Sequence, residues 1–292
     1  MDDLREMPVA EINEFRSSDG YTWKYRSYSP PSEVRGHVVC LHGIQSHSLW
    51  YEGSCQRMAG EGFAVSFLDR RGSGINEQAR GDTPSFRRLL DDVAEFVRPL
   101  RSTGAPVILL AISWGGKLAV GFQRRHPGLI DGMILVAPGF CPRVQPSFAE
   151  KVKIAWSSLV RPGRHFPIPL NDPELFTTNA ERLQFLREDP LALHEATGRF
   201  LAQSTRLDWY LPWAKKRVNI PVLLMLAEHD RIIDNDRTRK FVGGFATEDV
   251  TILEYPGAHH TLEFEPDPSF VFDDLSEWLD AHVPASKKTT KT

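Results

Sequence analysis

The chain has 292 residues, of which 41% are hydrophobic and 25% are charged, and its formal net charge is −3. This balance is typical of a globular protein, and the near-neutral charge excludes both a strongly basic nucleic-acid-binding protein and an acidic disordered chain. No apolar stretch approaches the roughly 18 residues that span a bilayer, and the acidic start of the chain does not resemble a signal peptide.

Strand and helix patterns alternate along both ends of the chain. Two strand-like segments, 11–16 and 21–28, flank a Ser-Asp-Gly turn at 18–20. Short apolar runs then predict strands buried on both faces, and they occupy residues 37–41, 64–68, 107–112, 133–136, 222–226 and 250–255. Helical patterns occur at 86–100, 117–125 and 275–282. This alternation predicts an α/β fold with a mostly parallel central sheet flanked by helices.

Residues 139–219 break the alternation, because they contain helical patterns and no convincing strand. The first helix carries an apolar stripe of Phe148, Val152, Trp156 and Leu159, and further helices are expected around 183–186 and over 191–207. We therefore predict a core of residues 1–138 and 220–285, a helical cap insertion at 139–219, and a disordered tail at 286–292. The stripe is interpreted first as packing against the core. The alternative is an acyl-binding wall that also touches lipid interfaces.

Ser113 is the candidate nucleophile. It follows the apolar run 107–112 and precedes a helical pattern, which is the context of a strand–Ser–helix nucleophile elbow. The close packing of strand and helix requires small residues two positions to either side, and these are Ala111 and Gly115. Ala111 departs from the usual G-x-S-x-G. A helix N-terminus favours a developing negative charge, although a serine that merely caps the helix is the alternative interpretation.

A serine hydroxyl needs a base to take its proton and an acid to orient that base. In an elbow of this kind the chain order is Ser, then acid, then His. Asp230 closes the segment that begins with the run 222–226, and His260 follows a Gly-Ala turn after the run 250–255. The alternatives are Glu228, Asp234 and Asp236 for the acid, the last two as caps of the following helix, and His259 for the base.

The oxyanion of such a reaction needs preorganised hydrogen-bond donors. One candidate is the backbone N–H of Trp114, directly after the nucleophile, and the other is that of Ile44 in the loop after the run 37–41. Gly43 allows this loop to turn. His42 precedes the nucleophile in the chain, so it is interpreted as a residue that supports the loop through hydrogen bonds.

Five segments together resemble the monoacylglycerol lipase and lysophospholipase group of α/β-hydrolases, which is also grouped with serine aminopeptidase-type hydrolases. They are H-G-I-Q-S-H-S at 42–48, D-R-R-G-S-G at 69–74, the elbow around Ser113, A-E-H-D-R-I-I-D at 227–234 and G-A-H-H-T-L at 257–262. The resemblance covers roughly residues 36–265. It implies that His260 is the base, Asp230 the acid, and Ile44 and Trp114 the oxyanion donors. Residues 69–74 are interpreted as a structural turn.

The resemblance implies hydrolysis of a carboxylic ester through an acyl-enzyme, with no metal or cofactor. The expected substrate is a monoacylglycerol, a lysophospholipid or a similar acyl ester, and the cap at 139–219 is expected to make transient contact with lipid interfaces. A carbon–carbon bond hydrolase and an aminopeptidase with the same triad are alternatives, and a non-catalytic binding protein on this fold is an alternative of another class. No nucleic-acid partner is expected, and the oligomeric state is left open.

The three cysteines, Cys40, Cys55 and Cys141, are odd in number, and their spacing fits neither a zinc site nor a C-x-x-C redox motif. They are expected to be reduced thiols, which is typical of a cytoplasmic protein.

Overall fold

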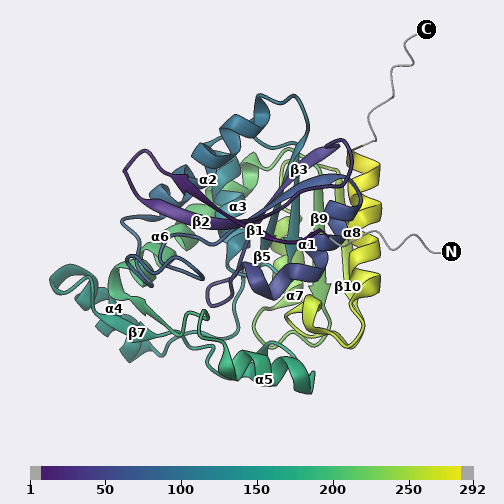
Figure 1. The fold of residues 1–292 in the computed structure, drawn as a ribbon. Coiled ribbons are helices and arrows are strands. Elements are labelled where there is room, and N and C mark those ends of the chain that lie inside the picture. Colours follow the sequence, from purple (N-terminus) through teal and green to yellow (C-terminus); the bar gives the residue numbers. More distant parts are fainter. Residues whose placement is uncertain (1–7, 284–292) are drawn as a thin grey trace, which may run out of the picture.

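The structure, a computed structural model, describes residues 8–283, so the expected disordered tail at 286–292 lies outside the described residues. Its main feature is an eight-stranded sheet in the order β1-β2-β4-β3-β5-β6-β9-β10 (Figure 1). The strands are β1 (Glu11–Arg16), β2 (Thr22–Tyr28), β3 (Gly36–Leu41), β4 (Phe63–Leu68), β5 (Val107–Ile112), β6 (Gly132–Val136), β9 (Val222–Ala227) and β10 (Val250–Tyr255).

Strand direction divides this sheet into two parts. The β1–β2 hairpin joins β4 in antiparallel fashion, whereas the strands from β4 to β10 in sheet order run parallel to one another. Every residue of β5 and β9 is buried, as uninterrupted apolar runs require when helices cover both faces of a sheet. The predicted mostly parallel sheet is confirmed.

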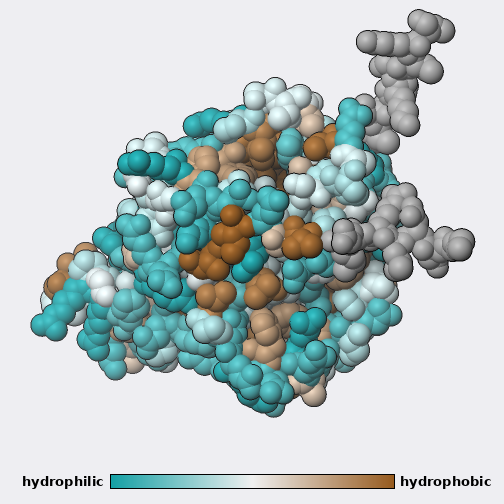
Figure 2. All heavy atoms as spheres, viewed as in Figure 1, coloured by the Kyte–Doolittle hydropathy of each residue, from teal (hydrophilic) through white to brown (hydrophobic). Residues whose placement is uncertain are grey.

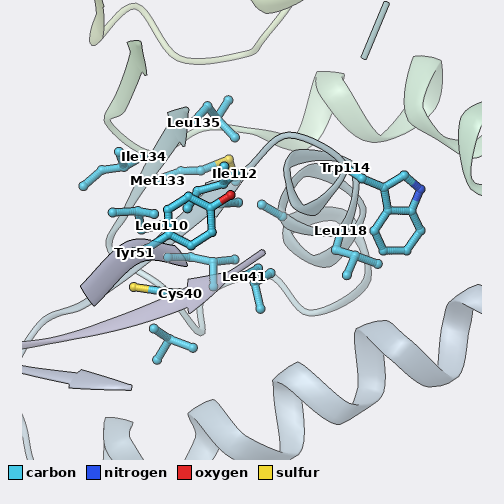
Figure 3. Packing of buried hydrophobic residues seen from close by; sticks show 14 of the residues in the cluster. Cys40, Leu41, Tyr51, Leu110, Ile112, Trp114, Leu118, Met133, Ile134 and Leu135 are labelled. Carbon is cyan, nitrogen blue, oxygen red and sulfur yellow. The ribbon is translucent and has the colours of Figure 1, made fainter. Parts of the chain in front are cut away.

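Five helices accompany the sheet: α1 (Glu52–Gly60), α2 (Phe86–Arg101), α3 (Gly115–Arg125), α7 (Asn235–Val242) and α8 (Ser269–His282). Helix α1 packs on β2 and β4 and contacts α8, whereas α2 and α3 pack on each other and on β5. Figure 3 shows the apolar side chains of β3, β5 and β6 packed together in the core. Helix α1 was not predicted, because its sequence EGSCQRMAG contains two glycines and lacks a clear apolar stripe.

Residues 139–219 contain three helices, α4 (Phe148–Val160), α5 (Ala180–Glu188) and α6 (Gly198–Ala214), together with two short strands, β7 (His165–Pro167) and β8 (Glu195–Thr197). The expectation of no strand in this segment is wrong, since β7 and β8 pair in an antiparallel sheet. The helix expected over 191–207 begins later and ends later. Its start is fixed by Thr197, whose side chain accepts the backbone N–H of Phe200 (3.1 Å) and so caps α6.

Helix α4 presents its apolar stripe to solvent instead of to the core. The exposed fractions of Phe148, Trp156 and Leu159 are 84%, 67% and 77%, and Val152 is also exposed. The first interpretation of the stripe, packing against the core, is therefore wrong. In Figure 2, hydrophobic atoms reach the surface at the left-hand tip, where Figure 1 places α4.

No helix in residues 8–283 combines the length and the apolar character needed to cross a membrane. Cys40, Cys55 and Cys141 are unpaired, and the first two are fully buried.

Candidate active site

Ser113 lies in the tight turn between β5 and α3. Its backbone φ of +51° is in the left-handed region, which residues with a side chain rarely adopt and which costs on the order of 1 kcal/mol or more. Three hydrogen bonds hold the turn: the N–H of Ser113 donates to Val136 O (2.9 Å), and the N–H groups of Gly116 (3.0 Å) and Gly139 (2.7 Å) donate to Ser113 O. Strain retained in this way is typical of a functional turn.

The residues around the turn explain why it needs small side chains. A Cβ on Gly115 would lie 2.6 Å from Leu41 O, and one on Gly43 would lie 3.2 Å from the Cβ of Ser113. Ala111, which departs from the usual motif, is fully buried and pairs with Leu41 across the sheet. The described structure therefore accommodates the methyl group of Ala111, while the glycine two residues after the serine is a steric requirement.

Three side chains from separate strand ends form one hydrogen-bonded chain. His260 Nε2 lies 3.0 Å from Ser113 Oγ, and His260 Nδ1 lies 2.7 Å from Asp230 Oδ2. The other carboxylate oxygen of Asp230 accepts the backbone N–H groups of Ile232 (2.8 Å) and Ile233 (2.9 Å). Both Asp230 and His260 are buried. The imidazole is thus oriented on one side by a fixed carboxylate and faces the serine hydroxyl on the other.

The alternative acids and the alternative base have other partners. Glu228 accepts the N–H of Gly257 (2.7 Å). Asp234 caps α7, and Asp236 pairs with Arg239. His259 contacts Glu265 (Nδ1–Oε1 3.1 Å) and turns away from the serine, since it is His260 that reaches Ser113.

The backbone N–H groups of Ile44 and Trp114 are free within residues 8–283, where neither donates to a protein acceptor. The Trp114 side chain points away from the strand packing in Figure 3. Its Nε1–H donates to Ser204 Oγ on α6 (2.9 Å), and its ring lies 5.3 Å from that of Phe200. Helix α6 therefore fixes the indole, while the backbone N–H of Trp114, directly after Ser113 in the chain, stays without a protein acceptor in residues 8–283.

His42 bonds its own loop. Its Nδ1 lies 2.7 Å from Gly43 O, and its Nε2 accepts the backbone N–H of Arg70 (3.1 Å). Burial, together with the nearby Arg70, holds the pKa of His42 well below its usual range, so the ring is neutral. A neutral imidazole has one donor and one acceptor, and here Nδ1–H donates while Nε2 accepts.

Arg70 was missed by the sequence analysis, which treated residues 69–74 as a structural turn only. Asp69 does hold that turn, because its carboxylate accepts the N–H groups of Ser48 (2.7 Å) and Ile75 (3.0 Å). The Arg70 guanidinium, however, donates to the carbonyls of Gly43 and Ile44. The sequence did hold one signal for this role. Arg70 is the second charged residue after the buried run 64–68, and a charged side chain at such a position needs hydrogen-bonding partners.

Residues 139–219 are joined to the loop that follows β3. Asp189 accepts from His47 Nε2 (2.8 Å) and from Trp50 Nε1 (2.7 Å), and all three side chains are buried. The N–H of Leu193 donates to Gln45 O (2.9 Å), directly after Ile44 in the chain. Residues 139–219 are thus directly connected to the loop that carries Ile44.

Comparison with known proteins identifies relatives along nearly the whole chain. Residues 32–267 match the family model described as serine aminopeptidase, S33. A monoacylglycerol lipase of Mycolicibacterium smegmatis is 27% identical over 92% of this chain and 96% of its own length. Phospholipase YtpA of Bacillus subtilis is 23% identical over 89% of this chain and 100% of its own length.

Solved structures show the same architecture. A soluble variant of the monoglyceride lipase of Saccharomyces cerevisiae, in complex with a substrate analog, has a TM-score of 0.81 at 21% identity and covers 96% of this chain and 97% of its own. The monoacylglycerol lipase of Paleococcus ferrophilus has a TM-score of 0.79 at 24% identity and covers 94% of this chain and 99% of its own. At these identities the likeness establishes the fold.

Proposed function

Since the chain belongs to the serine aminopeptidase S33 family and has the α/β-hydrolase fold, we propose that it hydrolyses monoacylglycerols, lysophospholipids or similar acyl esters with Ser113 as nucleophile. The observation that carries this proposal is the hydrogen-bonded chain from Ser113 through His260 to Asp230. The relatives named as a monoacylglycerol lipase and a phospholipase support the substrate class.

The reaction follows from the positions of these groups. Ser113 Oγ attacks the ester carbonyl carbon while its proton passes to His260 Nε2, and Asp230 stabilises the imidazolium that forms. The negative oxygen of the tetrahedral intermediate accepts the N–H groups of Ile44 and Trp114. His260 then returns the proton to the leaving alcohol oxygen, and an acyl-enzyme remains on Ser113. Water repeats the sequence with the same base, releasing the fatty acid and the free serine.

The proposed organisation is a core of residues 1–138 and 220–285 with a cap of residues 139–219. We propose that the cap meets lipid interfaces through the exposed α4 stripe, because contiguous exposed apolar side chains mark interaction surfaces. A fatty ester resides in such an interface, so contact there would bring the site to its substrate. The unpaired cysteines support the proposal of a reducing, cytoplasmic location.

Labelling with a fluorophosphonate probe tests the nucleophile. Wild type and Ser158→Ala, which removes a half-buried hydroxyl on α4 that donates to Ala155 O, should be labelled equally, and Ser113→Ala should not be labelled. His260→Ala should lower kcat by several orders of magnitude, whereas His259→Ala should stay within about threefold of wild type. Equal labelling of Ser113→Ala, or equal loss in the two histidine variants, contradicts the assignment.

A substrate panel tests the reaction class. Monoacylglycerols and lysophospholipids of increasing chain length should be cleaved faster than aminoacyl amides and dicarbonyl compounds, the substrates of the aminopeptidase and carbon–carbon hydrolase alternatives. A preference for either alternative substrate, retained in wild type and lost in Ser113→Ala, would keep the nucleophile and replace the substrate class.

A further inference from the structure

The buried guanidinium of Arg70 contacts the backbone of the loop that carries Ile44. Its Nη1 donates to Gly43 O (2.6 Å), its Nη2 donates to Ile44 O, and its backbone N–H donates to His42 Nε2 (3.1 Å). Its Cζ also lies 5.1 Å from the centroid of the Trp114 ring. One residue therefore contacts both segments that supply the two free amides beside Ser113.

The bond to Gly43 O acts directly on the Ile44 amide, because both groups belong to one peptide unit. Residues 8–283 contain no cis peptide bond, and in a planar trans peptide the C=O and the N–H point in opposite directions. Because the guanidinium binds Gly43 O on one side of the loop, the Ile44 N–H points to the opposite side of the loop. His42 Nδ1–H donates to the same oxygen (2.7 Å). Two donors, one of them charged, also polarise the peptide and make its N–H a stronger donor.

The charge of Arg70 is not neutralised by a contacting carboxylate within the described residues. Its neighbour Asp69 directs both carboxylate oxygens to backbone N–H groups. Arg71, by contrast, pairs with Asp19 and Asp92. Burial lowers the pKa of Arg70 to about 9, so the guanidinium remains charged at neutral pH. A fixed positive charge in a site of low polarity favours the anionic intermediate over the neutral ester.

We propose that Arg70 is a positioning residue of the oxyanion hole: it fixes the Gly43–Ile44 peptide, strengthens the Ile44 N–H as a donor and contributes a positive charge behind the oxyanion. This inference rests on the proposed function, since it concerns the same reaction. It predicts an effect on transition-state binding that exceeds any effect on substrate binding.

The test compares Arg70→Met, which removes the charge and the donors, with Arg70→Lys, which keeps the charge but cannot hold two carbonyls in the same planar fork. Arg80→Met is the matched control, because the Arg80 guanidinium also donates to backbone carbonyls, but to those of Gly74, Leu191 and Ala192 and not to those of Gly43 or Ile44. For each protein we would measure Tm, kcat and KM for a short soluble ester, and the affinity for an alkylboronic acid, whose adduct with the serine is tetrahedral and anionic.

Arg70→Met should lower kcat about 10- to 100-fold with KM changed less than about threefold, and its boronate affinity should fall by the same factor as kcat/KM. Arg70→Lys should lie between Arg70→Met and wild type. Arg80→Met should lower Tm while its kcat and boronate affinity stay within about threefold of wild type. A loss shared by kcat and boronate affinity is not expected from a role in folding alone.

A folded Arg70→Met variant with wild-type kcat and boronate affinity would overturn the proposal. If Arg70→Met does not fold, Arg70→Lys decides: parallel losses in kcat and boronate affinity support the proposal, and wild-type values of both overturn it. Failure of the proposed function is distinguishable, because it would appear as unlabelled Ser113 in the wild-type protein, whereas Arg70→Met should still be labelled, only more slowly.

Discussion

At the scale of single residues, Glu263 is the carboxyl group near the site whose ionisation the fold opposes most strongly. It lies three residues after His260, and its Oε1 accepts the backbone N–H of Ser54 (3.0 Å). Burial raises the pKa of Glu263 from its ordinary 4.5 to about 7, although the Ser54 hydrogen bond and the charge of Arg182 act in the opposite direction. The folded protein therefore prefers the protonated acid more than the unfolded chain does.

This preference makes the effect of Glu263→Gln on stability depend on pH. The stabilisation from the protonated acid is fully present below pH 4.5 and is lost as the pH rises through about 7. The glutamine variant has no such loss. Relative to wild type, its Tm should therefore rise by a few degrees between pH 5 and pH 8. The corresponding change in the free energy of unfolding has an upper limit of about 3 kcal/mol, which partial exposure of the residue reduces.

Thermal unfolding at intervals of one pH unit measures this gain. Glu248→Gln, a substitution at an exposed residue, is the control and should differ from wild type by a constant amount across the range. A Glu263→Gln curve parallel to wild type would contradict the raised pKa of Glu263.

Residues of the candidate site differ in how well the sequence reveals them. Ser113, Asp230 and His260 follow apolar runs and occur in a fixed order along the sequence. This local pattern identified the three side chains that the structure links by hydrogen bonds. Arg70 has no such pattern. Its contacts depend on how the ends of β3 and β4 pack side by side, which is a property of the folded sheet and not of the residues next to Arg70 in the chain.

At the scale of elements, the junction of β5 and α3 is the most sterically constrained part of the site. The first residue of α3, Gly115, lies against the end of β3, where a Cβ would be 2.6 Å from Leu41 O and 2.8 Å from His42 O. Backbone atoms cannot move aside as the end of a flexible side chain can. A methyl group here would displace the helix relative to the strand and so move Ser113.

Gly115→Ala is therefore expected to destabilise the protein by about 1–3 kcal/mol, the usual cost of overpacking, and to lower kcat at least tenfold. Gly60→Ala is the control, because Gly60 ends α1 and a Cβ there would meet no atom within 4 Å. That variant should be neutral or slightly more stable. Chemical denaturation and ester hydrolysis measure both effects, and an active Gly115→Ala variant of wild-type stability would show that the junction is looser than described.

Elements were predictable where their burial pattern is simple. Strands β5 and β9 consist of uninterrupted apolar residues, and each strand from β3 to β10 in the large sheet was expected within one or two residues of its position. Residues 139–219 were harder, because exposed apolar residues on α4 imitate the stripe of a buried helix. A periodic pattern indicates that one face of a helix is apolar, but it does not indicate whether other residues cover that face.

At the scale of the whole molecule, exposed apolar side chains gather in one region. Of the twelve large hydrophobic side chains that are exposed in residues 8–283, seven lie between residues 139 and 219. Besides the α4 stripe, they include Trp209 and Trp213 on α6, which border an open groove with Arg87, Arg124 and Arg206. Tryptophan and arginine side by side suit the boundary between water and anionic lipid. Helices α4 and α6 pack against each other, so the two surfaces lie on neighbouring helices.

Vesicle binding should therefore depend on both surfaces in different ways. Trp156→Ser on α4 should weaken binding to any vesicle about fivefold, since the loss of one partly inserted side chain costs about 1 kcal/mol. Arg206→Glu on α6 should weaken binding to anionic vesicles by a similar factor or more and leave binding to neutral vesicles unchanged. Co-sedimentation with phosphatidylcholine vesicles, with and without phosphatidylserine, measures both quantities.

Phe270→Ser supplies the control, because Phe270 is an exposed aromatic residue on α8, which Figure 1 shows on the opposite side of the molecule from α4. It should bind vesicles as wild type does. All three variants should hydrolyse a short soluble ester at the wild-type rate, because none contacts the Ser113–His260–Asp230 chain, whereas Trp156→Ser should hydrolyse a vesicle-borne monoacylglycerol more slowly. Equal loss of binding in Phe270→Ser and Trp156→Ser would mean that general surface hydrophobicity, and not the α4 stripe, brings the protein to the lipid.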